Sequence, residues 1–333
     1  MHQAYPSREV ADTETIQQSK NWLGAHAEDA GGFFMELHTG APHEPYYPEA
    51  QDAQKFAGEQ VPRSGSFNEA DVSDKANLTV RNAPPLCSTS VPNGSTSSCY
   101  RADGTLKTTY AQKDPVCNGL PELSIQCQDV RWRETLRDLQ KVDRAIGDYK
   151  AILQNHGEWA NTYVVYYTDN GLHLGQRRLP YGKQQPYEHA VNPFPLFVRG
   201  PGIPADTARG QLVANIDLAP TYAYMTGGQA NIPAFVEGRN ILNLAKGTAP
   251  GWPRSRIGIE RLNMSPTWRG IRTPTEKFVM FEGGGREYYN LINDPGELNN
   301  TWGSLSQAKK DALVAQANAL SNCSGAGCRT SDR

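Results

Sequence analysis

The sequence predicts an α/β fold, with a large α/β domain over residues 1–250 and a small antiparallel-sheet plus helix subdomain over residues 251–333. Three observations lead to this prediction. The 333 residues are enough to bury one large core. Helix-like and apolar strand-like segments alternate through the first part of the chain. The segments that follow are short, strand-like and broken by Gly and Pro, and the sequence contains no internal repeat.

The first domain begins with helix-forming residues at 9–28, followed by the short apolar run GGFFMELH at 31–38, which we interpret as a strand. Residues 41–129 show almost no periodicity, and so long a loop in a compact domain usually serves a site or an insertion. Residues 131–157 carry apolar side chains near one face and predict a long helix that stops at Gly157. The apolar positions of this helix are Leu136, Leu139, Val142, Ile146 and Ile152.

Two further strands and a helix complete the predicted domain. TYVVYYT at 162–168 and PLFVRG at 195–200 are strand-like, and Asp217 starts a helix over 216–227. In the second domain we expect four short strands and a final helix near 304–320. The four strand-like runs are RIGIERL, WRGIRTP, KFVMFEGG and EYYNLI.

The charge and hydropathy of the chain exclude two classes of partner. The 33 basic and 35 acidic side chains nearly cancel, and no dense Lys/Arg cluster suits a phosphate backbone, so we expect no nucleic-acid partner. No window approaches the roughly 20 apolar residues that a membrane-spanning helix needs, and the first ten residues have no signal-peptide pattern. The oligomeric state is left open.

The six cysteines favour disulfides. Four of them lie in a stretch rich in Ser, Thr, Gly and Pro that lacks the His and C-x-x-C spacings of a zinc site. We expect disulfides of open connectivity among Cys87, Cys99, Cys117, Cys127, Cys323 and Cys328. Glycosylation sequons begin at Asn77, Asn93, Asn263, Asn299 and Asn322. Together these favour a secreted, extracellular or lysosome-like location, and the alternative is an intracellular protein with six reduced thiols.

A polar triplet follows the strand at 162–168. Asp169 and Asn170 offer a carboxylate and an amide carbonyl side by side, which suits a hard cation such as calcium or magnesium. An Asp-Asn-Gly triplet alone is more often a turn. The loop that continues from it also contains His173 and Lys183, together with two arginines and a glutamate. Such aperiodic, charged loops at the carboxyl end of a strand are typical of functional sites.

Residues 168–205, TDNGLHLGQRRLPYGKQQPYEHAVNPFPLFVRGPGIPA, resemble a stretch shared by sulfatases of the N-acetylglucosamine-6-sulfatase and bacterial arylsulfatase type. APHEP at 41–45, SFNEADVSDK at 66–75 and REYYNLINDPGELNN at 286–300 are also similar to that family. The resemblance implies an alkaline-phosphatase-like mixed sheet between helices, incomplete at its N-terminus. It also implies hydrolysis of aryl or carbohydrate sulfate monoesters.

Carried over position by position, the resemblance makes Asp169 and Asn170 two ligands of a calcium ion. It places Lys183 and His43 at the sulfate and the departing oxygen, where a cation stabilises charge and a histidine protonates the leaving group. His173 either lines the substrate pocket or caps the turn. Without the family pattern, His43 would be interpreted as a loop histidine and Lys183 as a solvated surface charge.

The resemblance fails at the nucleophile. The family uses a cysteine, oxidised to formylglycine, in Cys-x-Pro-Ser-Arg or Cys-x-Ala-Ser-Arg, and none of the six cysteines has that tail. Residues 4–8, AYPSR, end correctly but carry alanine and lie too close to APHEP. The family's first pair of aspartate ligands is also missing. We therefore expect an N-terminally truncated chain that alone has little sulfatase activity, weak calcium affinity and a tendency to aggregate.

Two alternatives compete with a sulfatase. One is a phosphoesterase of the same superfamily, which normally surrounds two zinc ions with several Asp and His ligands, whereas this chain has too few histidines near its acidic clusters. The other is a non-catalytic remnant that binds a sulfated glycan or a partner protein, and the missing nucleophile motif favours it. The sequence leaves the sulfated substrate undetermined.

Overall fold

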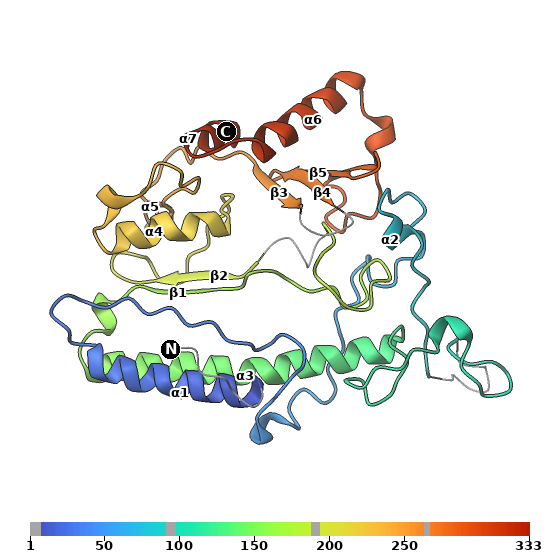
Figure 1. Ribbon diagram of the computed structural model, residues 1–333, viewed down its shortest axis with the longest axis horizontal. Coiled ribbons are helices and arrows are strands. Elements are labelled where there is room, and N and C mark those ends of the chain that lie inside the picture. The colour runs from blue at the N-terminus through green and yellow to red at the C-terminus, as the bar shows by residue number, and fades with distance from the viewer. Residues whose placement is uncertain (1–7, 91–97, 188–193, 263–266) are drawn as a thin grey trace. The chain divides into compact units, whose positions relative to one another are not determined.

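The computed structural model describes residues 8–90, 98–187, 194–262 and 267–333. They form two compact units (Figure 1). Unit 1 contains residues up to 62 and residues 86–162, and unit 2 contains residues 63–85 and 163–333. The expected domain boundary at residue 250 lies inside unit 2 and stays a prediction. None of the described helices is both long and apolar enough to cross a membrane.

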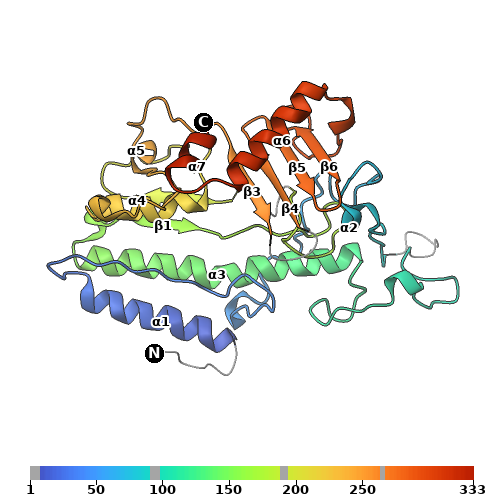
Figure 2. The same ribbon diagram turned by 45° about the horizontal axis from the view of Figure 1, so that its top comes forward.

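Unit 1 is built on two long helices. Helices α1 (Arg8–His26) and α3 (Ile125–Asn155) lie side by side (Figure 2) and confirm the two expected helices. Leu23, Ala27 and Leu153 form the buried contact between them. The short 3-10 turns η1 (Ala50–Asp52), η2 (Thr108–Tyr110) and η3 (Trp159–Asn161) interrupt the connecting segments.

The ends of α3 have clear physical causes. The Ser124 hydroxyl accepts the backbone N–H of Cys127 at 3.1 Å and so caps the first turn. At the other end Gly157 adopts φ +75°, a conformation that a side chain would disfavour, and the helix stops as expected.

The strand expected at 31–38 does not form. Side chains from Phe33 to His38 alternate between half-buried and exposed, as in a strand, and Phe33 and Met35 pack on the core of unit 1. No strand is assigned to these residues, and no hydrogen-bonded ladder joins them to another segment that the structure describes. The alternating pattern therefore predicted correctly which side chains are half-buried, whereas the prediction of a strand is wrong.

All six cysteines form disulfides, as predicted. In unit 1 the pairs are Cys87–Cys99 and Cys117–Cys127, and in unit 2 the pair is Cys323–Cys328. The partners within each pair are only 12, 10 and 5 residues apart in sequence. The two pairs of unit 1 therefore fasten the irregular stretch locally, and Cys127 anchors it to the first turn of α3.

Unit 2 contains two sheets. Strands β1 (Val164–Tyr167) and β2 (Leu196–Arg199) pair antiparallel, with Val165 opposite Val198. The helical segments of this unit that precede the C-terminal sheet in sequence are α2 (Leu78–Arg81), η4 (Asn215–Asp217), α4 (Leu218–Met225), η5 (Gln229–Asn231) and α5 (Leu242–Ala245). Helix α4 begins at the expected place. The side chain of Asp217 does not cap it, because its carboxylate accepts bonds from Ala214, Arg239 and Arg254.

The C-terminal sheet has the order β3-β4-β5-β6, with every pair antiparallel. Its strands are β3 (Ile257–Arg261), β4 (Trp268–Arg272), β5 (Glu276–Phe281) and β6 (Arg286–Asn290), which confirms all four expected runs. Turn η6 (Trp302–Ser304) leads to α6 (Gln307–Ser321), which covers one face of the sheet (Figure 2), and α7 (Ala326–Ser331) follows. At Gly270 a side chain would meet the Phe278 carbonyl oxygen at 2.0 Å.

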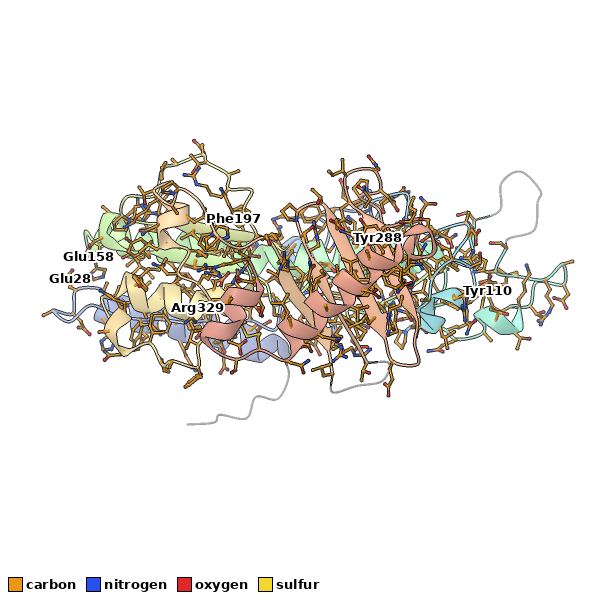
Figure 3. The ribbon with its side chains drawn as sticks, turned by 90° about the horizontal axis from the view of Figure 1, so that it is seen from above. Glu28, Tyr110, Glu158, Phe197, Tyr288 and Arg329 are labelled. Carbon is orange, nitrogen blue, oxygen red and sulfur yellow. A yellow bond between two sulfur atoms is a disulfide. The ribbon has the colours of Figure 1, made fainter. Side chains whose placement is uncertain are left out.

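The core of this sheet lies between its strands and α6. Ile271, Phe278 and Tyr288 occupy one row across β4, β5 and β6, and they pack against Leu313 and Ala317 of the helix. Tyr288 is labelled in Figure 3. The antiparallel sheet with one packed helix is the architecture that the sequence predicted for this part of the chain.

Candidate active site

The candidate metal ligands lie directly after β1. Asp169 is exposed and Asn170 is half-buried. The Thr168 hydroxyl donates to the Asn170 backbone carbonyl oxygen at 2.9 Å, and the Asn170 side-chain nitrogen donates to the Gly171 carbonyl oxygen at 3.0 Å. The turn therefore uses the nitrogen of the Asn170 amide, while the oxygen of that amide makes no hydrogen bond with the described residues.

The loop then folds back on itself. The His173 backbone N–H donates to the Gly182 carbonyl oxygen at 2.7 Å in an antiparallel bridge. Lys183 follows Gly182, so its backbone runs beside the residues that follow Asn170. Neither Asp169 nor Lys183 makes a side-chain hydrogen bond or ion pair with the described residues, which is unusual within a loop that is otherwise densely bonded.

His173 is fully buried, at 0% exposure. Its ring meets the Tyr187 ring edge-on, with centroids 6.4 Å apart. Its backbone forms the bridge that closes the loop, so a structural role is visible in the geometry. A direct contact with substrate stays a prediction.

Two neighbouring arginines fasten the loop to the rest of unit 2. Arg177 and Arg178 both have positive φ, at 51° and 63°. The buried Arg177 guanidinium donates to the backbone carbonyl oxygens of Gly296 and Glu297. Arg178 donates to three more carbonyl oxygens, those of Glu69, Ala70 and Ala83. These bonds offset the strained backbone and hold the loop on segments distant in sequence.

The end of the loop rests on a buried polar network. Glu287 of β6 accepts hydrogen bonds from the Asn77 backbone N–H at 2.9 Å, the Tyr187 hydroxyl at 3.1 Å and the Tyr289 hydroxyl at 2.8 Å. Burial raises the pKa of Glu287, and the three donors lower it again only in part. Burial and the Glu287 charge together raise the pKa values of Tyr187 and Tyr289, so both hydroxyls stay protonated and donate.

Asn77 is also a glycosylation sequon, and the structure argues against its modification in the folded protein. The side chain is 2% exposed, and its nitrogen donates to the Gln185 side-chain oxygen at 2.6 Å. The sequons at Asn93 and Asn263 lie outside the described residues, and Asn299 and Asn322 are exposed. Glycosylation at those positions stays a prediction.

Two lysines of unit 2 are buried, which the sequence alone did not predict. Lys75 is 0% exposed and pairs with Glu69 at 2.9 Å, and Lys277 is 1% exposed and pairs with Glu297 at 2.8 Å. Nothing in the periodicity distinguishes these lysines from surface lysines, which are far more common. In the sequence, Lys75 and Glu69 were indicated only by their position in the segment SFNEADVSDK.

His43 belongs to unit 1. It is exposed, and its ring nitrogen Nδ1 lies 2.6 Å from the Glu44 carbonyl oxygen. The preceding turn is held by Asp12, whose carboxylate accepts the backbone N–H groups of Gly40 and Ala41. Because His43 and the loop after β1 lie in different units, their convergence around one anion stays a prediction.

One further group of metal-binding residue types occurs among the described residues. Asp114, Cys117 and Cys127 lie within 4.8 Å of one another. Because the two cysteines form a disulfide and Asp114 pairs with Arg131, these atoms are not available as ligands. Asp169 and Asn170 remain the candidate cation ligands, and their oxygens suit a hard cation, but two donors are only part of the six to eight that calcium requires.

Comparison with known proteins places this geometry in a family. The sulfatase family model matches residues 2–228, and the model of the N-sulphoglucosamine sulphohydrolase C-terminal region matches residues 178–320. The N-acetylglucosamine-6-sulfatase of Bos taurus is 29% identical over 90% of this chain and 53% of its own length. The chain thus spans about half the length of the curated relatives it matches.

Solved structures agree on the fold. A protein solved in complex with its substrate D-glucosamine-2-N,6-O-disulfate superposes with a TM-score of 0.69, at 21% identity over 91% of this chain and 68% of that one. A phosphonate monoester hydrolase from Silicibacter pomeroyi reaches the same TM-score, at 20% identity over 91% and 57%. The fold is that of alkaline-phosphatase-like α/β proteins. Within this class the chain belongs to the sulfatase family.

Proposed function

We propose that the protein hydrolyses sulfate monoesters of a carbohydrate, and that this chain supplies the residues that bind the sulfate and the departing oxygen. One observation carries the proposal. Asp169, Asn170 and Lys183 lie on one loop of a sulfatase-family chain, with side-chain groups that the fold leaves uncommitted. The loop around them is fixed by the buried Arg177, the half-buried Arg178 and the Glu287 network.

The choice of a carbohydrate sulfate over an aryl sulfate rests on two similar proteins. The Bos taurus relative is an N-acetylglucosamine-6-sulfatase, and one structural relative was solved with a disulfated glucosamine. The phosphonate monoester hydrolase has the same fold, so the fold does not separate sulfate from phosphonate esters. A panel of esters is therefore part of the test below.

The chemistry assigns a role to each side chain. Displacement at sulfur builds negative charge on the sulfuryl oxygens and on the leaving oxygen. The ammonium of Lys183 neutralises charge on these oxygens. The imidazole of His43 gives a proton to the departing alcohol, a role that needs the two units to bring it to the loop. The backbone of His173, a buried residue of the same loop, bonds Gly182 and so orients the backbone that carries Lys183.

A divalent cation bound at Asp169 and Asn170 would polarise the sulfuryl oxygens. The donor chemistry fits calcium, but the donor number does not, so further oxygen ligands must come from outside this pair. We accordingly expect calorimetric titration of the 333-residue chain to show weak calcium binding. Asp169→Asn should remove even that binding, whereas tight stoichiometric binding would contradict the proposed ligand set.

The 333 residues contain no cysteine followed by x-Pro-Ser-Arg or x-Ala-Ser-Arg. The proposed reaction needs a nucleophile, and we propose that it lies outside these 333 residues. The formylglycine of the family remains part of the proposal for the whole protein. The three disulfides support synthesis in an oxidising compartment, and we propose a secreted or lysosome-like location.

The activity test compares two preparations. The native protein, captured with an antibody raised against this chain, should release sulfate from N-acetylglucosamine 6-sulfate or 4-nitrophenyl sulfate. The recombinant 333-residue chain should release none but should bind N-acetylglucosamine 6-sulfate through Lys183. Hydrolysis of phosphate or phosphonate esters by the native protein, without release of sulfate from the sulfate esters, would refute the proposal.

A further inference from the structure

Two arginines lie on the α6 side of the C-terminal sheet without a negatively charged partner. The register places Arg269 of β4 opposite Met280 of β5, and Met280 opposite Arg286 of β6. Paired residues point to the same face of a sheet, so both arginines flank Met280 on that face. Since neighbouring strands lie about 4.8 Å apart, the two backbones are roughly 10 Å apart.

This row continues the apolar row that α6 covers. Met280 belongs to the core with Ile271 and Phe278, two residues away along the strands. Both arginines are half-buried. Together with Thr267 and Glu282 they line a hollow of about 230 Å³. This volume is below the ~300–1,000 Å³ of pockets for drug-sized ligands, so the hollow fits one small group.

The charges around the hollow are not balanced. Arg269 makes no hydrogen bond or ion pair with the described residues, and Arg286 donates only to the neighbouring Gly285 carbonyl oxygen at 2.8 Å. Glu260, opposite Arg269 on β3, accepts the Ser321 hydroxyl instead. Glu282 is exposed and accepts the Thr267 hydroxyl at 2.8 Å. Neither neighbouring carboxylate therefore forms an ion pair with these two guanidinium groups, because Glu260 and Glu282 each accept a hydroxyl instead.

The two cations also repel each other. Burial lowers the pKa of Arg286, and the charge of Arg269 lowers it further. An anion placed between them would relieve this repulsion. The planar guanidinium group presents a fork of N–H donors that matches the oxygens of sulfate and carboxylate groups.

We propose that Arg269 and Arg286 form a second anion site, separate from the loop after β1, which binds a sulfate group of an acidic glycan. The choice of a sulfated glycan rests on the proposed function, whereas binding of an anion rests only on the two uncompensated arginines. The site would hold a sulfated chain at a sugar that is not being hydrolysed. Carboxylate groups of the same glycan share this chemistry, and the experiment separates the two.

Methionine provides a local reporter. The chain has five methionines, and of those that the structure describes, Met280 lines the hollow and Met35 lies in unit 1. The full 333-residue chain is labelled with 13C-methyl methionine, and Met280→Leu assigns the signal. The chain is titrated with inorganic sulfate, with a heparin tetrasaccharide, and with a desulfated tetrasaccharide that keeps its carboxylates. We expect a saturable shift of Met280 and not of Met35, strongest for the sulfated sugar.

The variant Arg269→Gln/Arg286→Gln should weaken tetrasaccharide binding about a hundredfold, roughly tenfold for each lost charge-assisted bond. Arg81→Gln/Arg333→Gln removes the same charge at two exposed positions and should change binding less than twofold. Thermal unfolding checks that both variants fold. Should the double variant be unfolded, the half-buried Arg286→Gln alone should still give the tenfold loss.

Three results would overturn the proposal. One is an unshifted Met280 with every ligand, and another is an equal loss in the control variant, which would indicate non-specific attraction. Equal binding of the desulfated sugar would refute the sulfate assignment. The proposed function is tested independently, because Met280 reports on this hollow whether or not the protein hydrolyses an ester. A silent Met280 with intact sulfate release refutes only the second site.

Discussion

The indole N–H of Trp268 donates a hydrogen bond to the backbone carbonyl oxygen of Gln184, at 3.0 Å. Gln184 directly follows Lys183, and Trp268 is the first residue of β4. This bond is one of those that join the loop carrying the candidate lysine to the C-terminal sheet. The Trp268 side chain that makes it is buried, at 5% exposure.

Trp268→Phe should lower the free energy of unfolding by ~0.5–1.5 kcal/mol, because the half-buried hydrogen bond to the Gln184 carbonyl oxygen is lost. It should also weaken the binding of N-acetylglucosamine 6-sulfate, because Lys183 loses its fixed position. Trp252→Phe is the matched control, since Trp252 donates to the Leu212 carbonyl oxygen at 2.9 Å, away from the loop. Urea unfolding and calorimetry measure the two effects. Equal loss of binding in both variants would refute the positioning role.

Lys183→Met should leave the free energy of unfolding within ~0.5 kcal/mol, because the ammonium group makes no bond with the described residues. The same change should abolish sulfate release by the native protein and weaken sulfate-ester binding by the chain about tenfold or more. Lys113→Met, at an exposed position of unit 1, should do neither. A Lys183→Met variant with wild-type binding would remove this residue from the site.

Asp52 should make unit 1 sensitive to acid. Hydrogen bonds from Arg144, at 2.6 and 3.1 Å, hold the pKa of Asp52 below its usual 3.8. A carboxyl group with a lowered pKa stabilises the fold above the unfolded value of 3.8, and this contribution is lost as the pH falls through the folded pKa. Asp52→Asn should flatten the melting temperature between about pH 5 and 2. Asp143→Asn, exposed on α3, should not.

Glu287 should have the opposite effect. Burial raises the pKa of Glu287 above the ordinary 4.5. The contribution of this carboxyl group to the free energy of unfolding is therefore complete below pH 4.5 and is lost as the pH rises through the pKa of the folded state. Glu287→Gln carries no charge and should remove this decline in the free energy of unfolding. Glu14→Gln, at an exposed position, should keep it. Denaturation measured from pH 4 to 8 distinguishes the two, and an unchanged slope in Glu287→Gln would show that the burial has no such effect.

The disulfides should contribute unequally. Cys117→Ser/Cys127→Ser opens a loop of 10 residues and should lower the free energy of unfolding by about 2–4 kcal/mol. Cys323→Ser/Cys328→Ser opens a loop of only 5 residues and should cost less, because a shorter loop restricts the unfolded chain less. Guanidinium unfolding of both double variants tests the order.

Local patterns predicted much of this fold. The helical spacing of apolar residues predicted α3, Gly157 predicted its end, and short apolar runs predicted β1 to β6. The failure at residues 31–38 has a physical cause. Alternation of side chains reports which face is buried, whereas a strand also needs a partner for its backbone, and no residue of the segment identifies that partner.

The candidate site was predictable in its chemistry and not in its support. Asp169 and Asn170 stand out because a carboxylate and an amide directly after a strand suit oxygen ligands, whereas Lys183 was singled out only by the family resemblance. Arg177 and Glu287 do not stand out, because burial of a charge depends on donors and acceptors contributed by distant segments. Sequence patterns report what a residue offers, and the tertiary fold decides which groups it meets.

The arginines that fasten the loop donate to main-chain oxygens of segments distant in sequence. Arg178 donates to residues 69, 70 and 83, and Arg177 donates to residues 296 and 297. A carbonyl oxygen is present whatever side chain its residue bears. Substitutions at Ala70 and Ala83 therefore keep the acceptors of Arg178 in place, whereas replacement of either arginine removes several bonds at once.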